Sequence, residues 1–200
     1  MGTPDERWLG ILLFDAVEEL DAVGPWEVLS WWTQNFPDDG YRATTFSVDG
    51  GPVRCAKGMT ITPECSAADV GPLEVLVHPG GRGTRPLLED TEHLDRVRQW
   101  RRDVPLMTSV CTGALVYAAA GLLTGRPATT YHDALDVLGA LDASIEVRRD
   151  DRFVDDGDVV TSSGVSAGID MALHLVARLV GPERARQVRR GIQYDPEPPV

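Results

Sequence analysis

Short apolar runs of strand length alternate with helical patterns along this chain, and this alternation restricts the fold more than any other feature. The first run, WLGILLF at residues 8–14, is continuously apolar, which is typical of a strand buried on both faces of a parallel sheet. We predict further strands at residues 41–48, 73–77, 105–110 and 159–162, a hairpin over 53–62, short strands at 145–147 and 153–154, and helices that begin near Pro25 and span 91–102, 112–123, 132–141, 166–179 and 182–193.

This order of elements predicts an α/β fold of the doubly wound, flavodoxin-like type, with a mostly parallel sheet and helices on both faces. No repeat, low-complexity run or long linker interrupts the sequence, so we expect one domain over residues 1–200. Ligands of such folds bind where parallel strands end. The residues that follow each apolar run are therefore the first candidates for a functional site.

The charge balance of the chain excludes several kinds of partner. The formal net charge is -12 at pH 7, and such an acidic surface repels phosphate backbones and anionic lipid, so we expect neither nucleic acid nor membrane as a partner. The longest apolar run is far shorter than the roughly 20 residues that span a bilayer, and the N-terminal sequence lacks the pattern of a secretory signal. Three cysteines give no disulfide framework, so we expect a cytoplasmic protein.

Residues 108–114 (TSVCTGA) carry the strongest chemical signal. An apolar strand ends and a helix begins almost at once, with Cys111 at the junction and the small residues Gly113 and Ala114 after it. This is the layout of a nucleophile elbow with Cys in place of Ser. A buried structural cysteine is the alternative, but the combined features favour a nucleophile. Because helix N-termini lower thiol pKa values, we predict a thiolate at Cys111.

Two more polar segments follow predicted strands. The chain reads HPGGRG after the strand at 73–77, where Gly80 and Gly81 allow backbone N–H groups to come close to a reacting atom. Its spacing fits neither a dinucleotide fingerprint nor a phosphate loop. Three carboxylates, those of Glu18, Glu19 and Asp21, precede the first helix. Position alone does not show which of them points toward the site.

Together these segments resemble the ThiJ/PfpI superfamily, with its class I glutamine amidotransferase-like fold, and within it the isonitrile hydratase branch. The matching stretches cover nearly the whole chain: LLFDAVEELDAVGPWEVL, VHPGGRG, TSVCTGALVYAAAGLLTGRPATT and SSGVSAGIDMALHLVARLVG. The resemblance implies that Cys111 is the nucleophile and that Asp21, not Glu18 or Glu19, is the carboxylate facing it. We expect these two groups to share one proton near neutral pH. The residues that match the oxyanion- and substrate-binding positions are Gly80, Gly81 and Thr112.

The activity implied by this resemblance is cofactor-independent hydration of an isonitrile to an N-formamide through a thioimidate. Two other classes stay open: a non-catalytic thiol or redox sensor or ligand-binding domain, and a glyoxalase, deglycase or amidase-like hydrolase. Related domains are fused to helix-turn-helix modules in transcription regulators, but no basic module of that kind follows here, so we do not expect a regulator. No His, Cys and Asp cluster has metal-ligand spacing, and we expect neither metal nor cofactor.

One departure from the hydratase pattern follows Ala-Thr-Thr, where the branch usually carries His-Trp and this chain has Tyr131-His132. A histidine beside the pocket is then displaced by one position. Protease-like relatives place a histidine directly after the nucleophile, but Thr112 stands there, so a Cys-His dyad of that type is not expected. We interpret the remaining histidines as structural: His78, His93 and His174.

The first helix carries Trp26, Trp31 and Trp32, more large apolar surface than one core-facing stripe needs. Members of the superfamily that resemble this chain are commonly dimers. We therefore expect a homodimer that acts on a small-molecule substrate.

Overall fold

The predicted apolar runs form the main strands of a seven-stranded sheet in the computed structural model, which describes residues 6–195. Residues 1–5, part of the N-terminal segment in which no secretory signal is expected, lie outside that range. The sheet consists of β1 Arg7–Leu13, β2 Tyr41–Ser47, β5 Cys65–Ser66, β6 Leu73–His78, β7 Leu106–Val110, β10 Phe153–Asp155 and β11 Val159–Ser162.

The strand order is β10-β11-β7-β6-β1-β2-β5. Its neighbouring strands pair in parallel except for β10, which runs antiparallel to β11 at one edge. Numbered along the chain, the five central strands β2, β1, β6, β7 and β11 follow the order 2-1-3-4-5 of flavodoxin-like sheets. The predicted fold class is therefore confirmed.

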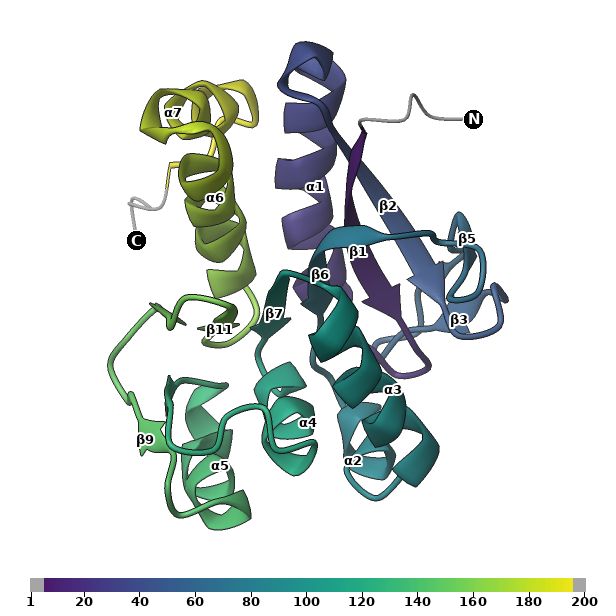
Figure 1. Cartoon of the computed structure of the whole chain (residues 1–200). Coiled ribbons are helices and arrows are strands. Elements are labelled where there is room, and N and C mark those ends of the chain that lie inside the picture. The colour runs from purple at the N-terminus through teal and green to yellow at the C-terminus, as the bar shows by residue number, and fades with distance from the viewer. Residues whose placement is uncertain (1–5, 196–200) are drawn as a thin grey trace.

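Helices cover both faces of this sheet (Figure 1). One layer consists of α1, α6 and α7, and the other contains α3, α4 and α5, with the short α2 beside them. Within residues 6–195, none of the helices is both long enough and apolar enough to cross a membrane. The helices are α1 Glu19–Asn35, α2 Thr84–Leu87, α3 Thr91–Asp103, α4 Gly113–Ala119, α5 Leu135–Leu141, α6 Ala167–Val180 and α7 Pro182–Gly191, with 3-10 turns η1 Pro37–Asp39 and η2 His132–Ala134.

The continuous apolar character of β1 is explained by its two buried faces. Leu9 and Ile11 point into the cluster beneath α1, α6 and α7, whereas Leu12 points into the cluster beneath the other helices. All three side chains are fully buried. Alternate residues of one strand thus serve two cores, which is why no polar residue interrupts the run.

The predicted hairpin is present as β3 Val53–Arg54 paired with β4 Thr60–Ile61. A second small sheet, β8 Pro127–Ala128 with β9 Glu146–Val147, joins segments on either side of α5. The sequence did not predict β5, β8 or α2, because two to four residues are too few to show a period.

The start of the first helix differs from the prediction. Helix α1 begins at Glu19, and Pro25 lies inside it rather than in its first turn. The proline ring is accommodated against α6, where its Cγ atom lies 3.3 Å from the position of a Cβ on Gly168. As a result, Glu18 is the N-cap and Asp21 belongs to the first turn. The carboxylates therefore sit at the positive end of the helix dipole.

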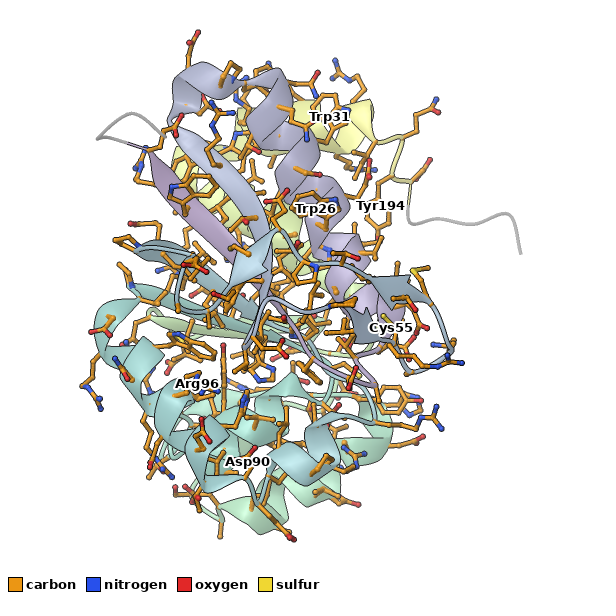
Figure 2. All side chains as sticks on the ribbon, turned by 90° about the vertical axis from the view of Figure 1, so that its right-hand side faces the viewer. Trp26, Trp31, Cys55, Asp90, Arg96 and Tyr194 are labelled. Carbon is orange, nitrogen blue, oxygen red and sulfur yellow. The ribbon has the colours of Figure 1, made fainter. Side chains whose placement is uncertain are left out.

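Three tryptophans of α1 occupy different environments. Trp32 is fully buried, and its Nε1 donates to Asp39 Oδ2 at 2.7 Å. Trp31 packs against α7, since a Cβ on Gly191 would lie 2.0 Å from its ring. Trp26 is half-buried. Figure 2 shows Trp26 and Trp31 along the helix, away from Asp90 and Arg96 at the far end of the molecule.

Candidate active site

Three consecutive parallel strands of the sheet end at one place, and each delivers part of the site. Asp21 follows β1, the loop with Gly80 follows β6, and Cys111 follows β7. The Gly80 N–H donates to Asp21 Oδ2 at 2.9 Å. A Cβ on Gly80 would lie 2.5 Å from the backbone N of Thr112 and 2.8 Å from that same carboxylate oxygen. Only glycine fits between these groups, so the structure brings the sequence-predicted residues together through a glycine contact.

The backbone at Cys111 has the strained geometry of an elbow. Its φ angle is 55°, in the left-handed region that L side chains rarely adopt. Its N–H points to the carbonyl oxygens of Ser162 and Ser163 at 3.1 and 3.2 Å, and its own carbonyl accepts from Thr130 Oγ1 at 2.7 Å. These bonds hold the turn between β7 and α4, in which Cys111 is 6% exposed.

Thr112 fixes the glycine loop through its hydroxyl. Thr112 Oγ1 accepts from the Gly81 N–H at 3.0 Å and lies 3.1 Å from Thr84 Oγ1. Because the N–H groups of Gly80 and Gly81 already donate within the protein, the geometry favours a positioning role for both glycines. The backbone N–H groups that act on the sulfur are those of Thr112 and Val165.

The pKa of the Cys111 thiol is higher than the sequence predicts. Burial, followed by the charge of Asp21, raises the pKa of Cys111 to about 12, and the N–H groups of Thr112 and Val165 offset only part of this. The predicted lowering of the thiol pKa is therefore wrong for this structure. The reason is that only two backbone N–H groups favour the thiolate, one at the start of α4 and one at Val165 before α6, whereas burial and a neighbouring carboxylate both disfavour it.

The pKa of the Asp21 carboxyl is raised as well. Burial raises the pKa of Asp21 to about 7, against the lowering effect of the Gly80 N–H. Asp21 is fully buried, and its Oδ1 atom has no hydrogen-bond partner among the described residues. Because the two groups interact, they titrate as a pair. The pair holds two protons below about pH 7 and one proton between about 7 and 12.

Cys111 faces a pocket of about 360 Å³. Gly81 and Thr112 form part of its wall. Sequence reasoning missed most of the rest, because these side chains come from separate loops. The remaining lining residues are Glu18, Lys57, Arg82, Arg85, Tyr131 and Val165.

Val165 is the least expected of these residues. Its φ angle is 48°, and a β-branched residue in the left-handed region is a genuine outlier. The strained turn directs its N–H at the Cys111 sulfur. Beside it, the ring of Tyr131 lies so close to Gly164 that a Cβ there would be 2.4 Å from the ring. The sequence SSGVSAG contains no feature that identifies Val165 in advance.

The other acidic residues of the helix start are engaged elsewhere. Glu18 forms an ion pair with Lys57 on the β3–β4 hairpin, and Glu19 Oε1 accepts from the Lys57 backbone N–H at 2.7 Å. The hairpin is thereby attached to α1. Asp21 is left as the carboxylate buried beside the thiol.

No histidine among the described residues lines this pocket. The side chain of His132 is 72% exposed and lies 2.9 Å from Asp133. His174 is half-buried and its Nε2 atom lies 2.7 Å from Asp155 Oδ2, so it is a hydrogen-bond partner at the surface and not a core residue. Within residues 6–195, no group of three or more His, Cys, Asp or Glu side chains has the arrangement of metal ligands.

His78 and His93 form a buried pair behind the glycine loop. His78 Nδ1 lies 2.8 Å from the Pro79 carbonyl oxygen, which can only accept, so this nitrogen carries the proton. His78 Nε2 then accepts from His93 Nε2 at 3.1 Å. Burial lowers the pKa values to about 3 and about 4, so both rings are neutral. These two histidines therefore have a structural role. They support the peptide between Pro79 and Gly80, whose N–H binds Asp21.

Comparison with known proteins agrees with this geometry. The DJ-1/PfpI family matches residues 9–178. The chain belongs to the DJ-1/PfpI family. It is 41% identical to the isonitrile hydratase of Pseudomonas putida over 194 residues, which is 96% of this chain and 80% of that protein. The solved structure of a ThiJ/PfpI family protein from Pseudomonas syringae superposes with a TM-score of 0.85 at 29% identity, covering 98% of this chain and 78% of that one.

Relatives of this chain include proteins of other kinds. The HTH-type transcriptional regulator CdhR of Pseudomonas aeruginosa is 32% identical over 88% of this chain, which spans half of the regulator's length. The structure of Drosophila melanogaster DJ-1beta has a TM-score of 0.81 at 24% identity over 95% of this chain and 99% of that chain, which shows a common fold. Membership therefore confirms the superfamily that the sequence resembles.

The raised pKa of Asp21 predicts a specific effect of pH on stability. A carboxyl with a folded pKa near 7 and an unfolded pKa near 3.8 stabilises the fold fully below about pH 4, and this stabilisation is lost as pH rises toward 7. In Asp21→Asn this dependence is absent. The melting temperature of the variant should therefore rise relative to wild type between pH 4.5 and 7.5 and stay level above that range.

Thermal unfolding over this pH series checks the expectation, with Asp38→Asn as the control because Asp38 is exposed on η1. A difference between Asp21→Asn and wild type that is constant with pH would show that Asp21 is ionised throughout.

Proposed function

We propose that this protein is a cofactor-independent isonitrile hydratase in which Cys111 is the nucleophile and Asp21 the proton donor and acceptor. The observation that carries the proposal is the buried Cys111–Asp21 pair, which retains one proton from about pH 7 to about 12. The 41% identity to an isonitrile hydratase over nearly the whole chain supports it. The substrate is a small molecule that fits the pocket of about 360 Å³, and the three free cysteines are compatible with a reducing cytoplasm.

In the first half-reaction the proton that the pair retains moves from the Cys111 sulfur to Asp21, and the sulfur attacks as a thiolate. A bond forms between Cys111 Sγ and the terminal carbon of the isonitrile, and one C–N bond of the triple bond is lost. Asp21 transfers its proton to that carbon, which gives a thioimidate and leaves an aspartate anion. The N–H groups of Thr112 and Val165 stabilise the thiolate before attack.

In the second half-reaction the Asp21 anion takes a proton from water while the water oxygen bonds to the thioimidate carbon. This proton passes to the substrate nitrogen. The remaining hydroxyl proton then returns to Asp21 as the C–S bond breaks and the sulfur leaves as a thiolate. The product is an N-formamide, and the pair recovers its single proton. Both half-reactions use one carboxyl with a pKa of about 7, which suits a general acid and base near neutral pH.

The raised thiol pKa bears on the sensor alternative. Oxidants react with the thiolate, and susceptibility follows thiolate character and exposure. Cys111 is buried and its pKa is about 12, so burial favours an enzyme whose thiol is activated within the pair.

A panel of isonitriles, amides, nitriles and dicarbonyls distinguishes the hydratase from the glyoxalase, deglycase and amidase-like alternatives. If the protein converts none of the isonitriles in the panel, the proposal is contradicted.

Cys111→Ala should reduce isonitrile turnover by several orders of magnitude, because the covalent route is lost with the sulfur. Formamide production by purified protein measures this, and circular dichroism verifies the fold. The matched controls are Cys55→Ser and Cys65→Ser, which should retain nearly full activity; Figure 2 shows Cys55 on the hairpin segment. Activity of Cys111→Ala above about one per cent of wild type, or an equal loss in a control, would assign the nucleophile elsewhere.

Asp21→Asn should separate chemistry from thiol reactivity. Turnover should fall about 10²–10⁴-fold because Asn delivers no proton. Alkylation of Cys111 near pH 8 should become faster, because the carboxylate charge that raises the thiol pKa is removed. In the wild type, kcat/KM should rise with pH up to about 7 and then level off, as the pair loses its first proton.

Glu18→Gln and Glu19→Gln are the controls and should change turnover little. Full activity in Asp21→Asn, or slower alkylation of its thiol, would show that Cys111 and Asp21 do not act as a unit.

We also propose that the protein is a homodimer. Leu20 and Val23 on α1 are each 38% exposed, and Met59 on the hairpin is 52% exposed. Val23, Met59 and Trp26 line a largely apolar pocket of about 290 Å³. A second copy that covers this face would bury apolar surface otherwise in contact with water.

Light scattering coupled to size exclusion should give twice the chain mass at micromolar concentration. Val23→Glu should shift the protein toward the monomer, whereas Val137→Glu should not, because Val137 is similarly exposed on α5 in the other layer. A wild-type mass equal to one chain would contradict the dimer.

A further inference from the structure

The mouth of the Cys111 pocket carries two arginines that no carboxylate of residues 6–195 neutralises. Arg82 and Arg85 line the pocket and are exposed. Neither has a described carboxylate oxygen within 4.0 Å, whereas most arginines of the chain form ion pairs, for example Arg126 with Asp158. The third cation of the pocket, Lys57, is neutralised by Glu18 and lies near Glu19.

Hydrogen bonds hold both guanidinium groups in the wall of the pocket that Cys111 faces. Arg85 Nη1 donates to Thr84 Oγ1 at 3.2 Å, and that hydroxyl lies 3.1 Å from Thr112 Oγ1, next to the nucleophile in the chain. Arg82 Nη2 donates to the Ala56 carbonyl on the hairpin. A guanidinium has five N–H donors, so each arginine keeps donors that are free to bind a ligand.

The positive charge of Arg82 and Arg85 is opposite in sign to the net charge of the whole chain. The formal net charge is -12, and a field of that sign repels anions in general. Two unneutralised cations at the mouth of one pocket reverse the local field. A guanidinium fork matches a carboxylate or phosphate in geometry and can bind it bidentately.

We propose that Arg82 and Arg85 form a subsite for an anionic oxygen group on the substrate, and that the preferred substrate is an isonitrile bearing a carboxylate. This inference rests on the proposed function for its reactive end. The isonitrile carbon lies at Cys111 while the carboxylate binds the arginines, so the substrate is held at two points. Such two-point binding orients the carbon toward the sulfur.

The first test compares two isonitriles of the same skeleton, one with a free carboxylate and one with its primary amide. Wild-type kcat/KM should be at least tenfold higher for the carboxylate. Arg82→Gln and Arg85→Gln should each lower this ratio several-fold, through a higher KM for the carboxylate. Arg102→Gln is the control, because Arg102 is exposed on α3, has no described carboxylate within 4.0 Å and lies outside the pocket. A phosphonate analogue shows whether the subsite accepts phosphate-like groups as well.

The second test does not depend on turnover. In a Cys55→Ser, Cys65→Ser background, Cys111 is alkylated with iodoacetate, which is anionic, and with iodoacetamide, which is neutral and of similar size. Both reagents react with the same thiolate, so the ratio of the iodoacetate rate to the iodoacetamide rate does not depend on the thiol pKa. It should fall several-fold in Arg82→Gln and Arg85→Gln, fall further in the double variant and in 0.5 M salt, and stay constant in Arg102→Gln.

The outcomes separate the two proposals. An alkylation ratio that is equal in wild type and in the arginine variants would overturn the subsite, whatever the enzyme hydrates. A ratio that falls as expected while no isonitrile reacts would support the subsite and refute the hydratase. Equal kcat/KM for the carboxylate and the amide in all variants would overturn the subsite and leave the hydratase intact.

Discussion

The whole site depends on how closely the ends of β1, β6 and β7 approach one another. Between Asp21 and Thr112 there is room for the backbone of Gly80 and for nothing larger, and a Cβ on Gly113 would lie 2.3 Å from the carbonyl oxygen of His78. Two glycines thus let three strand ends meet without intervening side chains. This contact fixes the carboxylate against the thiol, and it excludes the water that would otherwise keep both groups charged. The neutral His78–His93 pair supports the same loop from behind.

The chemistry of the pair follows from competition between burial and hydrogen bonding. Two N–H groups favour a charged sulfur and one favours a charged Asp21, but burial opposes both charges and their mutual repulsion adds to it. The pair therefore keeps one proton over a wide range of pH. A nucleophile and an acid that share a proton can both act only when the substrate accepts that proton, which couples thiol activation to the reaction. A catalytic Cys-His dyad would place a positive charge beside the thiol instead, and no described histidine is positioned to do so.

Much of this arrangement could be predicted from the sequence because it is local in the chain. The apolar run of β1 and the junction at Cys111 each follow from neighbouring residues, and the family motif distinguished Asp21 from the adjacent glutamates. The predicted helix start at Pro25 was wrong because packing against α6 tolerates a proline inside α1. The pKa of Cys111 moved in the unexpected direction because burial is a property of the folded chain. The left-handed turn at Val165 and the arginines at the pocket mouth depend on loops distant in sequence, which no local pattern brings together.

The attachment of the hairpin to α1 has a practical consequence. Lys57 is the only lysine in the sequence, and its ion pair with Glu18 places it on the wall of the reactive pocket while its side chain stays 68% exposed. Pairing with Glu18 raises the pKa of this amine, which slows acylation of its neutral form. Once the more acidic α-amino group has been blocked, an amine-directed fluorophore would be attached at this one side chain, beside the pocket mouth. The emission of this fluorophore would report ligand binding in real time without an engineered labelling site. A ligand that separates Lys57 from Glu18 would also change the rate at which Lys57 is acylated.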